Sequence, residues 1–240
     1  MYYGYGGYGG VGYGLDWTVL LLIGGALLSM LASGGMKSTF AKYSQIRSHS
    51  GLTGAMAAQR ILSAAGITDV VIQPIAGNLT DHYDPRNKTV NLSQASYGQT
   101  SLAAIGVAAH ECGHAIQHNT NYAPLNIRSA IVPIANIGSS LSWPIFIAGL
   151  VFSIPMLLKA GIILFSAAVL FQLVTLPVEF NASARALRML SSTGIMGDNE
   201  ISGSRKVLRA AAMTYVAALA SSVLQLLRLI ILAGGRNRDD

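Results

Sequence analysis

Four long apolar segments constrain the fold of this chain more than any other feature of its sequence. Their ranges are 17–36, 129–158, 160–178 and 210–233, and the only charged residue within them is Arg228. A helix of roughly 20 apolar residues is long enough to cross the hydrocarbon core of a bilayer. The charged fraction of 11% and the mean hydropathy of +0.47 are both far from those of an average soluble protein. The sequence therefore predicts a polytopic membrane protein, mainly α-helical, with about four transmembrane helices.

The basic residues indicate how the chain lies in the bilayer. Twelve of the 16 Lys and Arg residues fall within residues 37–128 and 179–209; the exceptions are Lys159, Arg228, Arg236 and Arg238. Cytoplasmic loops carry an excess of Lys and Arg, so we expect these two segments in the cytoplasm and both termini outside. No aromatic and basic module typical of nucleic-acid binding accompanies the net charge of +6. The expected partner is therefore the lipid bilayer and not a nucleic acid.

The N-terminal segment has a composition of its own. Residues 1–16 are a Gly/Tyr-rich tail that begins MYYGYGGYGG. Such a composition cannot bury a hydrophobic core, so we expect a disordered or interfacial tail. Residues 17–36 lack a preceding basic stretch and the small-residue cleavage site of a signal peptide. They are therefore predicted to be a retained transmembrane anchor.

Residues 37–128 are more polar than the segments around them. Thr53 can cap a first helix, and residues 68–75 have the composition of a strand. Residues 79–93 predict two short strands joined by a Pro/Asn turn, and residues 102–118 predict an alanine-rich helix. A strand, a hairpin and then a helix is the order of elements in zincins. We therefore expect a small α+β zincin-like subdomain on the cytoplasmic side.

The remainder of the chain divides at its apolar segments. Residues 129–178 predict two transmembrane helices, and residues 179–209 predict a helix and a loop that are polar and basic. Residues 210–240 predict a last transmembrane helix with a short tail. Prolines within residues 129–158 would kink the helix there, which a membrane helix tolerates when its neighbours satisfy the freed carbonyl groups.

The predicted helix 102–118 carries the stretch AAHECGHAIQHN. Residues four apart share one face of a helix, so His110 and His114 can present two imidazoles to one metal ion. Zinc suits imidazole ligands, and a catalytic zinc keeps one position open for water. Glu111 would stand beside that position and act as general base. A five-residue match also occurs by chance, but these polar groups would otherwise be buried in an apolar helix at a cost.

A catalytic zinc of this kind needs a third protein ligand. Gln117 and Thr120 stand where a metzincin would have glycine and histidine, which excludes that class. A downstream glutamate is the alternative, and the chain has only three glutamates, Glu111, Glu179 and Glu200. Glu200 lies in the loop-like sequence GDNE, where a solvated carboxylate is expected. Elimination therefore favours Glu179 as the third ligand.

The position of Glu179 supports the same choice. It follows directly after an apolar segment, where an unpaired carboxylate is costly and therefore functional by default. Ser183, one helical turn later, is a candidate to orient a ligand. The alternative explanation for Glu179 is a salt bridge at the membrane interface with Arg185 or Arg128.

Three further residues are weaker candidates for the site. His118 lies four residues after His114 and is a ligand, an outer partner of a ligand, or the polar end of the helix; the last is favoured. His82 and Tyr83 lie in the predicted hairpin, whose edge strand could pair with a substrate peptide, and either side chain could stabilise an oxyanion. An ordinary polar turn is the favoured explanation for both.

Four stretches together resemble a known family: AHECGHAIQH, LTDHYDPRNKTVNLS, YAPLNIRSAIVPIANIGS and FQLVTLPVEFNASARAL. They are similar to the YugP-like bacterial membrane zinc metallopeptidases, and the similarity covers nearly the whole chain after the first apolar segment. The resemblance implies a multi-pass peptidase of the bacterial cell membrane. It also implies that His110 and His114 bind zinc and that Glu111 is catalytic. The family's VEFNAS segment matches this chain at Glu179.

This family is distantly similar to the HtpX-like and prenyl-protein protease gluzincins. Those proteins place an aspartate four residues after the glutamate that binds the metal. Ser183 stands at that position here. The resemblance therefore supports a glutamate ligand at Glu179. It does not extend to the aspartate that orients the ligands in those proteins, because Ser183 takes its place.

The leading hypothesis is a membrane-embedded zinc endopeptidase that cuts peptide bonds of membrane-associated or misfolded proteins at the cytoplasmic face. Intramembrane cleavage of the site-two protease kind would need a late Asp-Gly pair, but Gly197 and Asp198 come in the opposite order. The alternative is a non-catalytic membrane protein with a structural zinc site, which would need four protein ligands with His118 as the fourth. Small residues in the first apolar segment are compatible with a homo-oligomer.

Overall fold

The computed structural model describes residues 16–236, so the predicted Gly/Tyr-rich tail lies outside the described residues except for Asp16. Within this range four helices are long and apolar enough to cross a membrane: α1 (Val19–Ser44), α5 (Ala123–Val151), α6 (Pro155–Ser192) and α7 (Asp198–Arg236). The other elements are α2 (Gly54–Ala64), β1 (Val71–Ile75), β2 (His82–Asp84), β3 (Thr89–Ser93), α3 (Gln94–Tyr97) and α4 (Leu102–Asn119). The predicted fold class, a mainly α polytopic protein with a small α+β part, is confirmed.

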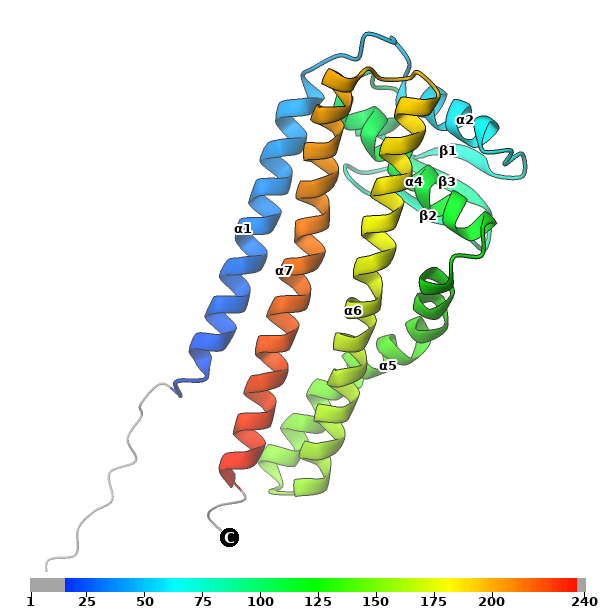
Figure 1. Cartoon of the computed structure of the whole chain (residues 1–240). Coiled ribbons are helices and arrows are strands. Elements are labelled where there is room, and N and C mark those ends of the chain that lie inside the picture. The colour runs from blue at the N-terminus through cyan, green and yellow to red at the C-terminus, as the bar shows by residue number, and fades with distance from the viewer. Residues whose placement is uncertain (1–15, 237–240) are drawn as a thin grey trace, which may run out of the picture.

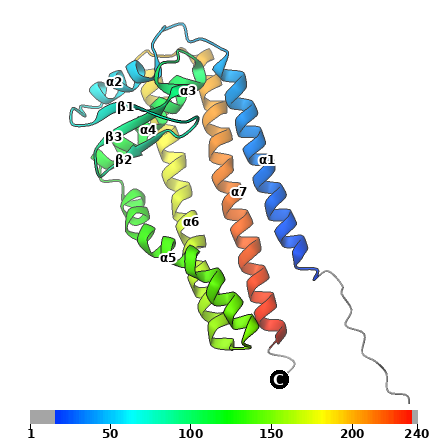
Figure 2. The same ribbon diagram turned by 180° about the vertical axis from the view of Figure 1, so that it is seen from behind.

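The four long helices stand together, and the small α+β subdomain lies at one end of them (Figure 1). α1, α7 and α6 run side by side, and α1 begins and α7 ends at the end opposite the subdomain (Figures 1 and 2). α5 packs against α6 at that opposite end and diverges from it toward the subdomain in both views. The beginning of α5 therefore lies near the subdomain, and Arg128 in its first turns still reaches Glu179 of α6.

The sheet of the subdomain has the strand order β1-β3-β2. β1 pairs with β3 in parallel, and β2 pairs with β3 in antiparallel as the predicted hairpin. Val90 and Leu92 of β3 are fully buried. The carboxylate of Asp81 anchors the start of β2, because it accepts hydrogen bonds from the backbone N–H and the hydroxyl of Ser93 at 2.8 and 2.9 Å. β2 lies beside α4, and its outer edge has no strand partner among the described residues.

α4 is the central helix of the protein and packs against α2, α6 and α7. Ser101 caps its N-terminus, since the hydroxyl oxygen accepts a hydrogen bond from the backbone N–H of Ala104 at 3.2 Å. Its small residues let the neighbouring helices approach closely. At Gly113 a Cβ atom would lie 2.4 Å from the carbonyl oxygen of Ala182 in α6, so this approach requires glycine. The close contact between α4 and α6 determines which α6 side chains face α4.

α6 differs from the sequence-based expectation. The sequence divides the chain between residues 178 and 179, but α6 continues without a break through Pro177 and Glu179. A proline is tolerated within a membrane helix when neighbouring groups satisfy the backbone around it. Pro177 lacks the N–H that would bond the carbonyl of Leu173 one turn earlier. A separate contact next to the proline joins α6 to α4, because the side chain of Gln117 donates a hydrogen bond to the carbonyl oxygen of Val178 at 2.8 Å. α1 likewise continues beyond the expected end at residue 36, as far as Ser44.

Candidate metal centre

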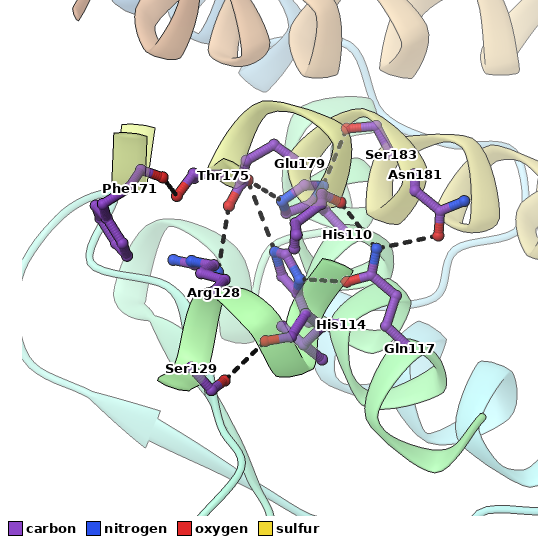
Figure 3. Close-up of polar contacts among 12 residues, drawn as sticks. His110, His114, Gln117, Arg128, Ser129, Phe171, Thr175, Glu179, Asn181 and Ser183 are labelled. Carbon is purple, nitrogen blue, oxygen red and sulfur yellow. Dashed lines mark hydrogen bonds and ion pairs between the residues drawn. The ribbon is translucent and has the colours of Figure 1, made fainter. Parts of the chain in front are cut away.

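Two helices supply three metal-ligating side chains to one point (Figure 3). His110 and His114 lie one turn apart on α4, and Glu179 faces them from α6. Oε2 of Glu179 lies 3.3 Å from Nε2 of His110 and 3.7 Å from Nε2 of His114. All three donor atoms lie within 4.8 Å of one another. The structure therefore brings together the two local histidines and the distant glutamate that the sequence singled out.

The spacing of these donors fits a zinc ion. Zinc binds imidazole nitrogen and carboxylate oxygen at roughly 2.0–2.2 Å, so ligand atoms of a tetrahedral site lie roughly 3.3–3.5 Å apart. The distances of 3.3 and 3.7 Å between the Glu179 oxygen and the two imidazole nitrogens are close to this range. Three protein ligands leave one tetrahedral position for water or substrate, as in catalytic zinc sites.

The electrostatics around the three donors favour a cation. The Glu179 side chain is only 4% exposed, and a carboxylate buried to this extent needs positive charge nearby. Burial lowers the pKa of His114, but the Glu179 and Glu111 carboxylates and the Gln117 hydrogen bond outweigh it, so the net effect raises the pKa of His114. The cluster therefore attracts positive charge to the point that the donors share.

Both imidazoles are oriented by a second hydrogen bond at Nδ1. Oε1 of Gln117 accepts a hydrogen bond from Nδ1 of His114 at 3.0 Å, and the hydroxyl of Ser183 lies 3.1 Å from Nδ1 of His110 (Figure 3). Partners of this kind fix the tautomer and the ring orientation of histidine ligands. With Nδ1 engaged, each ring turns Nε2 toward Glu179. Ser183, the sequence candidate for orienting a ligand, thus lies beside the ring of His110.

Arg128 of α5 lies on the other side of Glu179. Its Nη1 atom is 3.6 Å from Oε1 of Glu179, whereas Oε2 faces the histidines. The ion pair and the candidate metal position therefore use different oxygens of one carboxylate, so a salt bridge and a ligand role are compatible. Arg185, the other expected partner, instead donates a hydrogen bond to Asn181 at 2.8 Å.

Replacing Gln117 by alanine is expected to weaken zinc binding by roughly 10- to 100-fold, the usual effect of removing an outer partner of a ligand. Gln117 is completely buried, and its amide links His114 to the carbonyl oxygen of Val178 and to Asn181 on α6. Competition with a chromophoric chelator measures the affinity. Gln59→Ala, on the exposed side of α2, is the matched control. Equal zinc affinity in the two variants would contradict the orienting role.

A cavity of about 600 Å³ borders the three donors, within the usual size range of ligand sites. Its walls come from the β2 hairpin, α4, the beginning of α5, α6 and α7. Glu111, only 7% exposed, lines this cavity together with His110 and also lines a second, smaller cavity. Tyr215 of α7 lines both cavities as well. The candidate general base and the metal donors therefore line the same space, which is large enough to hold a substrate.

Comparison with known proteins is consistent with this geometry. The family described as "Putative neutral zinc metallopeptidase" matches residues 18–234 of the chain. The chain belongs to this family. It is also 47% identical over 222 residues to "Putative membrane protease YugP" of Bacillus subtilis (strain 168), which covers 92% of this chain and 99% of the relative. No solved structure matches the chain.

Membership of this family confirms the resemblance to YugP-like proteins that the sequence motifs indicated. It also supports zinc as the cofactor, since the family is one of zinc peptidases and the cluster of His110, His114 and Glu179 is able to bind a metal. Four apolar helices and a relative named as a membrane protease make this a membrane protein of a protease family.

The weaker candidates lie near the cluster but outside it. Nδ1 of His118 and the hydroxyl of Tyr83 are 2.8 Å apart, so His118 is turned to the hairpin and not to the metal donors. Burial, with the Asp69 and Asp84 charges, raises the pKa of Tyr83 to about 12, which keeps this hydroxyl protonated. His82 is exposed on β2 and, like Tyr83, lines the larger cavity.

Sequence reasoning missed two residues of this region. Gln117 was used only to exclude a metzincin, although a glutamine three residues after His114 on an apolar helix was a signal that it faces the same neighbour. Tyr215 had no signal of its own, because nothing in the sequence of α7 relates it to α4. Its position depends on how the long helices pack.

Proposed function

We propose that this protein is a zinc metallopeptidase that hydrolyses peptide bonds of membrane-associated or misfolded proteins at the cytoplasmic face of the bacterial cell membrane. Glu111 is the general base, and His110, His114 and Glu179 hold the zinc. The observation that carries the proposal is the position of Glu111. It follows a metal-ligating histidine directly and lines the cavity that borders all three donor atoms.

The chemistry divides between the metal and the chain. Zinc held by these donors supplies a water molecule of lowered pKa and polarises the carbonyl group of the substrate. The Glu111 carboxylate accepts the proton of the attacking water and delivers it to the nitrogen of the leaving amine. Because Glu111 is only 7% exposed, little bulk water competes for that proton. Gln117 and Ser183 keep the two imidazoles in orientation throughout.

The edge strand β2 gives an extended substrate a place to bind. Its outer edge has no strand partner among residues 16–236, and β2 residues line the larger cavity. A peptide that pairs with this edge gains backbone hydrogen bonds and passes along the cavity wall. Arg86 and Arg128 line the same cavity and add positive charge that favours peptide carbonyl or carboxylate groups.

The fold supports the cytoplasmic orientation of the site. The subdomain and the connection from α6 to α7 lie at the same end of the long helices (Figure 1). These are also the parts of the chain in which most Lys and Arg residues are found. The excess of positive charge at one end favours the cytoplasm for that end and the outside for the termini.

A structural zinc site is the second class of function considered for this chain. Such a site is closed by four protein ligands and has no use for a free base. In the described part of the chain, the metal-ligating group consists of His110, His114 and Glu179. His118, the expected fourth ligand, is hydrogen bonded to Tyr83 instead. The peptidase is therefore the better supported function.

A quenched-fluorescence peptide library tests the proposal with the detergent-purified full chain. Cleavage is expected for the zinc-loaded protein, loss of cleavage after treatment with a zinc chelator, and recovery after zinc is added back. Zinc content is measured on each sample. A fully zinc-loaded, folded protein that cleaves neither the library nor membrane-associated model proteins would refute the proposed peptidase activity.

A further inference from the structure

A second, smaller cavity also borders the metal cluster. Its volume is about 120 Å³. Side chains from α1, α4, α7 and the loop before β2 give it an apolar lining: Met36, Leu79, Val107, Leu208, Ala211 and Ala212. The residues that line both cavities form a shared wall, and they are Asp81, His110, Glu111, Glu179 and Tyr215. Any group bound in the small cavity therefore lies directly beside the metal donors and the candidate base.

We propose that this apolar cavity is a specificity pocket that binds the side chain of one substrate residue next to the cleaved peptide bond, and that it selects a branched aliphatic residue such as Leu, Ile or Val. This inference rests on the peptidase function proposed above. A side chain in the small cavity and a backbone in the larger cavity would place the intervening peptide bond at the shared wall, beside Glu111.

The size of the cavity supports an aliphatic occupant. An apolar cavity of roughly 150 Å³ in a protein interior binds benzene and stays free of water. The cavity of about 120 Å³ found here is somewhat smaller, so it suits a four-carbon side chain better than an aromatic ring. Leu208 and Ala212 are 3% and 5% exposed, so this part of the wall is well buried and gives a charged side chain little solvation.

The loop before β2 holds one wall of the cavity in place. Leu79 in this loop has a φ of 57°, a left-handed conformation that is rare for a large side chain. Such a conformation persists only where the surrounding structure enforces it, often at a ligand site. Two residues later, Asp81 accepts two hydrogen bonds from Ser93 and ties the loop to β3. The strained backbone thus directs Leu79 to the cavity beside the metal cluster.

The linings of the two cavities differ in polarity, so the two substrate positions that flank the cut should differ in how strongly they select a side chain. The larger cavity includes His82, Arg86, Asn126 and Arg128 in its lining and so has no uniform apolar surface. We therefore expect a strong preference at one of the two positions that flank the cut and a weak preference at the other. Mass spectrometry of the products of a random peptide library identifies the selective position, whichever side of the cut it lies on.

The test then uses two peptides that differ only at the selective position, Leu in one and Ala in the other. In a hydrophobic pocket even one methylene changes kcat/KM by roughly 10- to 200-fold, so the wild type is expected to favour Leu at least tenfold. Ala212→Leu fills the cavity and should reduce this ratio toward one or below. Leu208→Ala enlarges it and should raise kcat/KM for a Phe peptide relative to the Leu peptide.

These outcomes separate the pocket from the peptidase. Cleavage by the wild type with no apolar preference at either flanking position, or ratios unchanged in both variants at full zinc content, would overturn the pocket and leave the peptidase intact. Absence of cleavage by zinc-loaded wild type would remove the proposed function and the pocket with it. If Ala212→Leu fails to fold, the opposite change in Leu208→Ala still decides the question.

Discussion

Replacement of Glu111 by glutamine should nearly abolish peptide hydrolysis while zinc remains bound. Glutamine has the shape of glutamate, so the packing of α4 is kept, but an amide cannot accept the proton of the attacking water. A positioned general base typically contributes roughly 10²- to 10⁴-fold, so kcat is expected to fall by that factor. Glu111 is not one of the three metal-ligating residues, which is why zinc should stay.

Initial rates on a cleaved library peptide, together with one zinc measurement per variant, check this result. Glu200→Gln is the matched control, because it removes a carboxylate outside the metal cluster, where Glu200 accepts a hydrogen bond from the backbone N–H of His49 at 2.8 Å. The control should keep wild-type rates. Rates of Glu111→Gln close to the control would show that another group is the base, and loss of zinc would show that Glu111 serves the metal site itself.

The local part of the site could be predicted from the sequence because its geometry is set by one helix. The alanine-rich run predicted a helix at 102–118, and α4 spans Leu102–Asn119. Once that helix exists, the spacing of His110 and His114 puts both rings on one face. The apolar segments were equally visible, because a membrane-crossing helix needs length and composition only.

Glu179 could be predicted from the sequence for a different reason. The scarcity of glutamates left two candidates, and the cost of a carboxylate after an apolar segment favoured one of them. The structure brings Glu179 beside the histidines because Gly113 lets α4 approach the backbone of α6. No pattern in the sequence predicts that close approach. Glu179 was therefore predicted from the chemistry of a buried carboxylate and not from the packing of α4 against α6.

The rest of the site depends on packing between elements that are distant in the sequence. Gln117 reaches the backbone of α6, and Tyr215 lines both cavities at the cluster from α7. The small apolar cavity needs α1, α4, α7 and the loop of Leu79 at once. Hydropathy predicts each long helix separately but not its rotation or its neighbours, so none of these relations could be predicted from the sequence.

Replacement of Glu179 by alanine should cause the largest loss of zinc of any change outside the HECGH stretch. Removing even an outer partner of a ligand costs roughly 10- to 100-fold in metal affinity, so removal of a ligand should cost at least roughly 100-fold. The variant would also leave Arg128 without its partner, beside the two imidazoles. Zinc analysis after dialysis at fixed free zinc measures the effect. Glu200→Ala should keep its zinc, and the reverse pattern would remove Glu179 from the site.

Arg128 allows the two explanations of Glu179 to be separated. If Glu179 only neutralises Arg128, zinc is lost in Glu179→Ala because an uncompensated positive charge repels the ion, and Arg128→Ala combined with Glu179→Ala should restore binding. If Oε2 of Glu179 is a ligand, the double variant still lacks a donor and stays without zinc. The 3.6 Å contact of Arg128 involves Oε1, whereas Oε2 is the oxygen 3.3 Å from His110. Because the two contacts use different oxygens, we expect the double variant to remain without zinc.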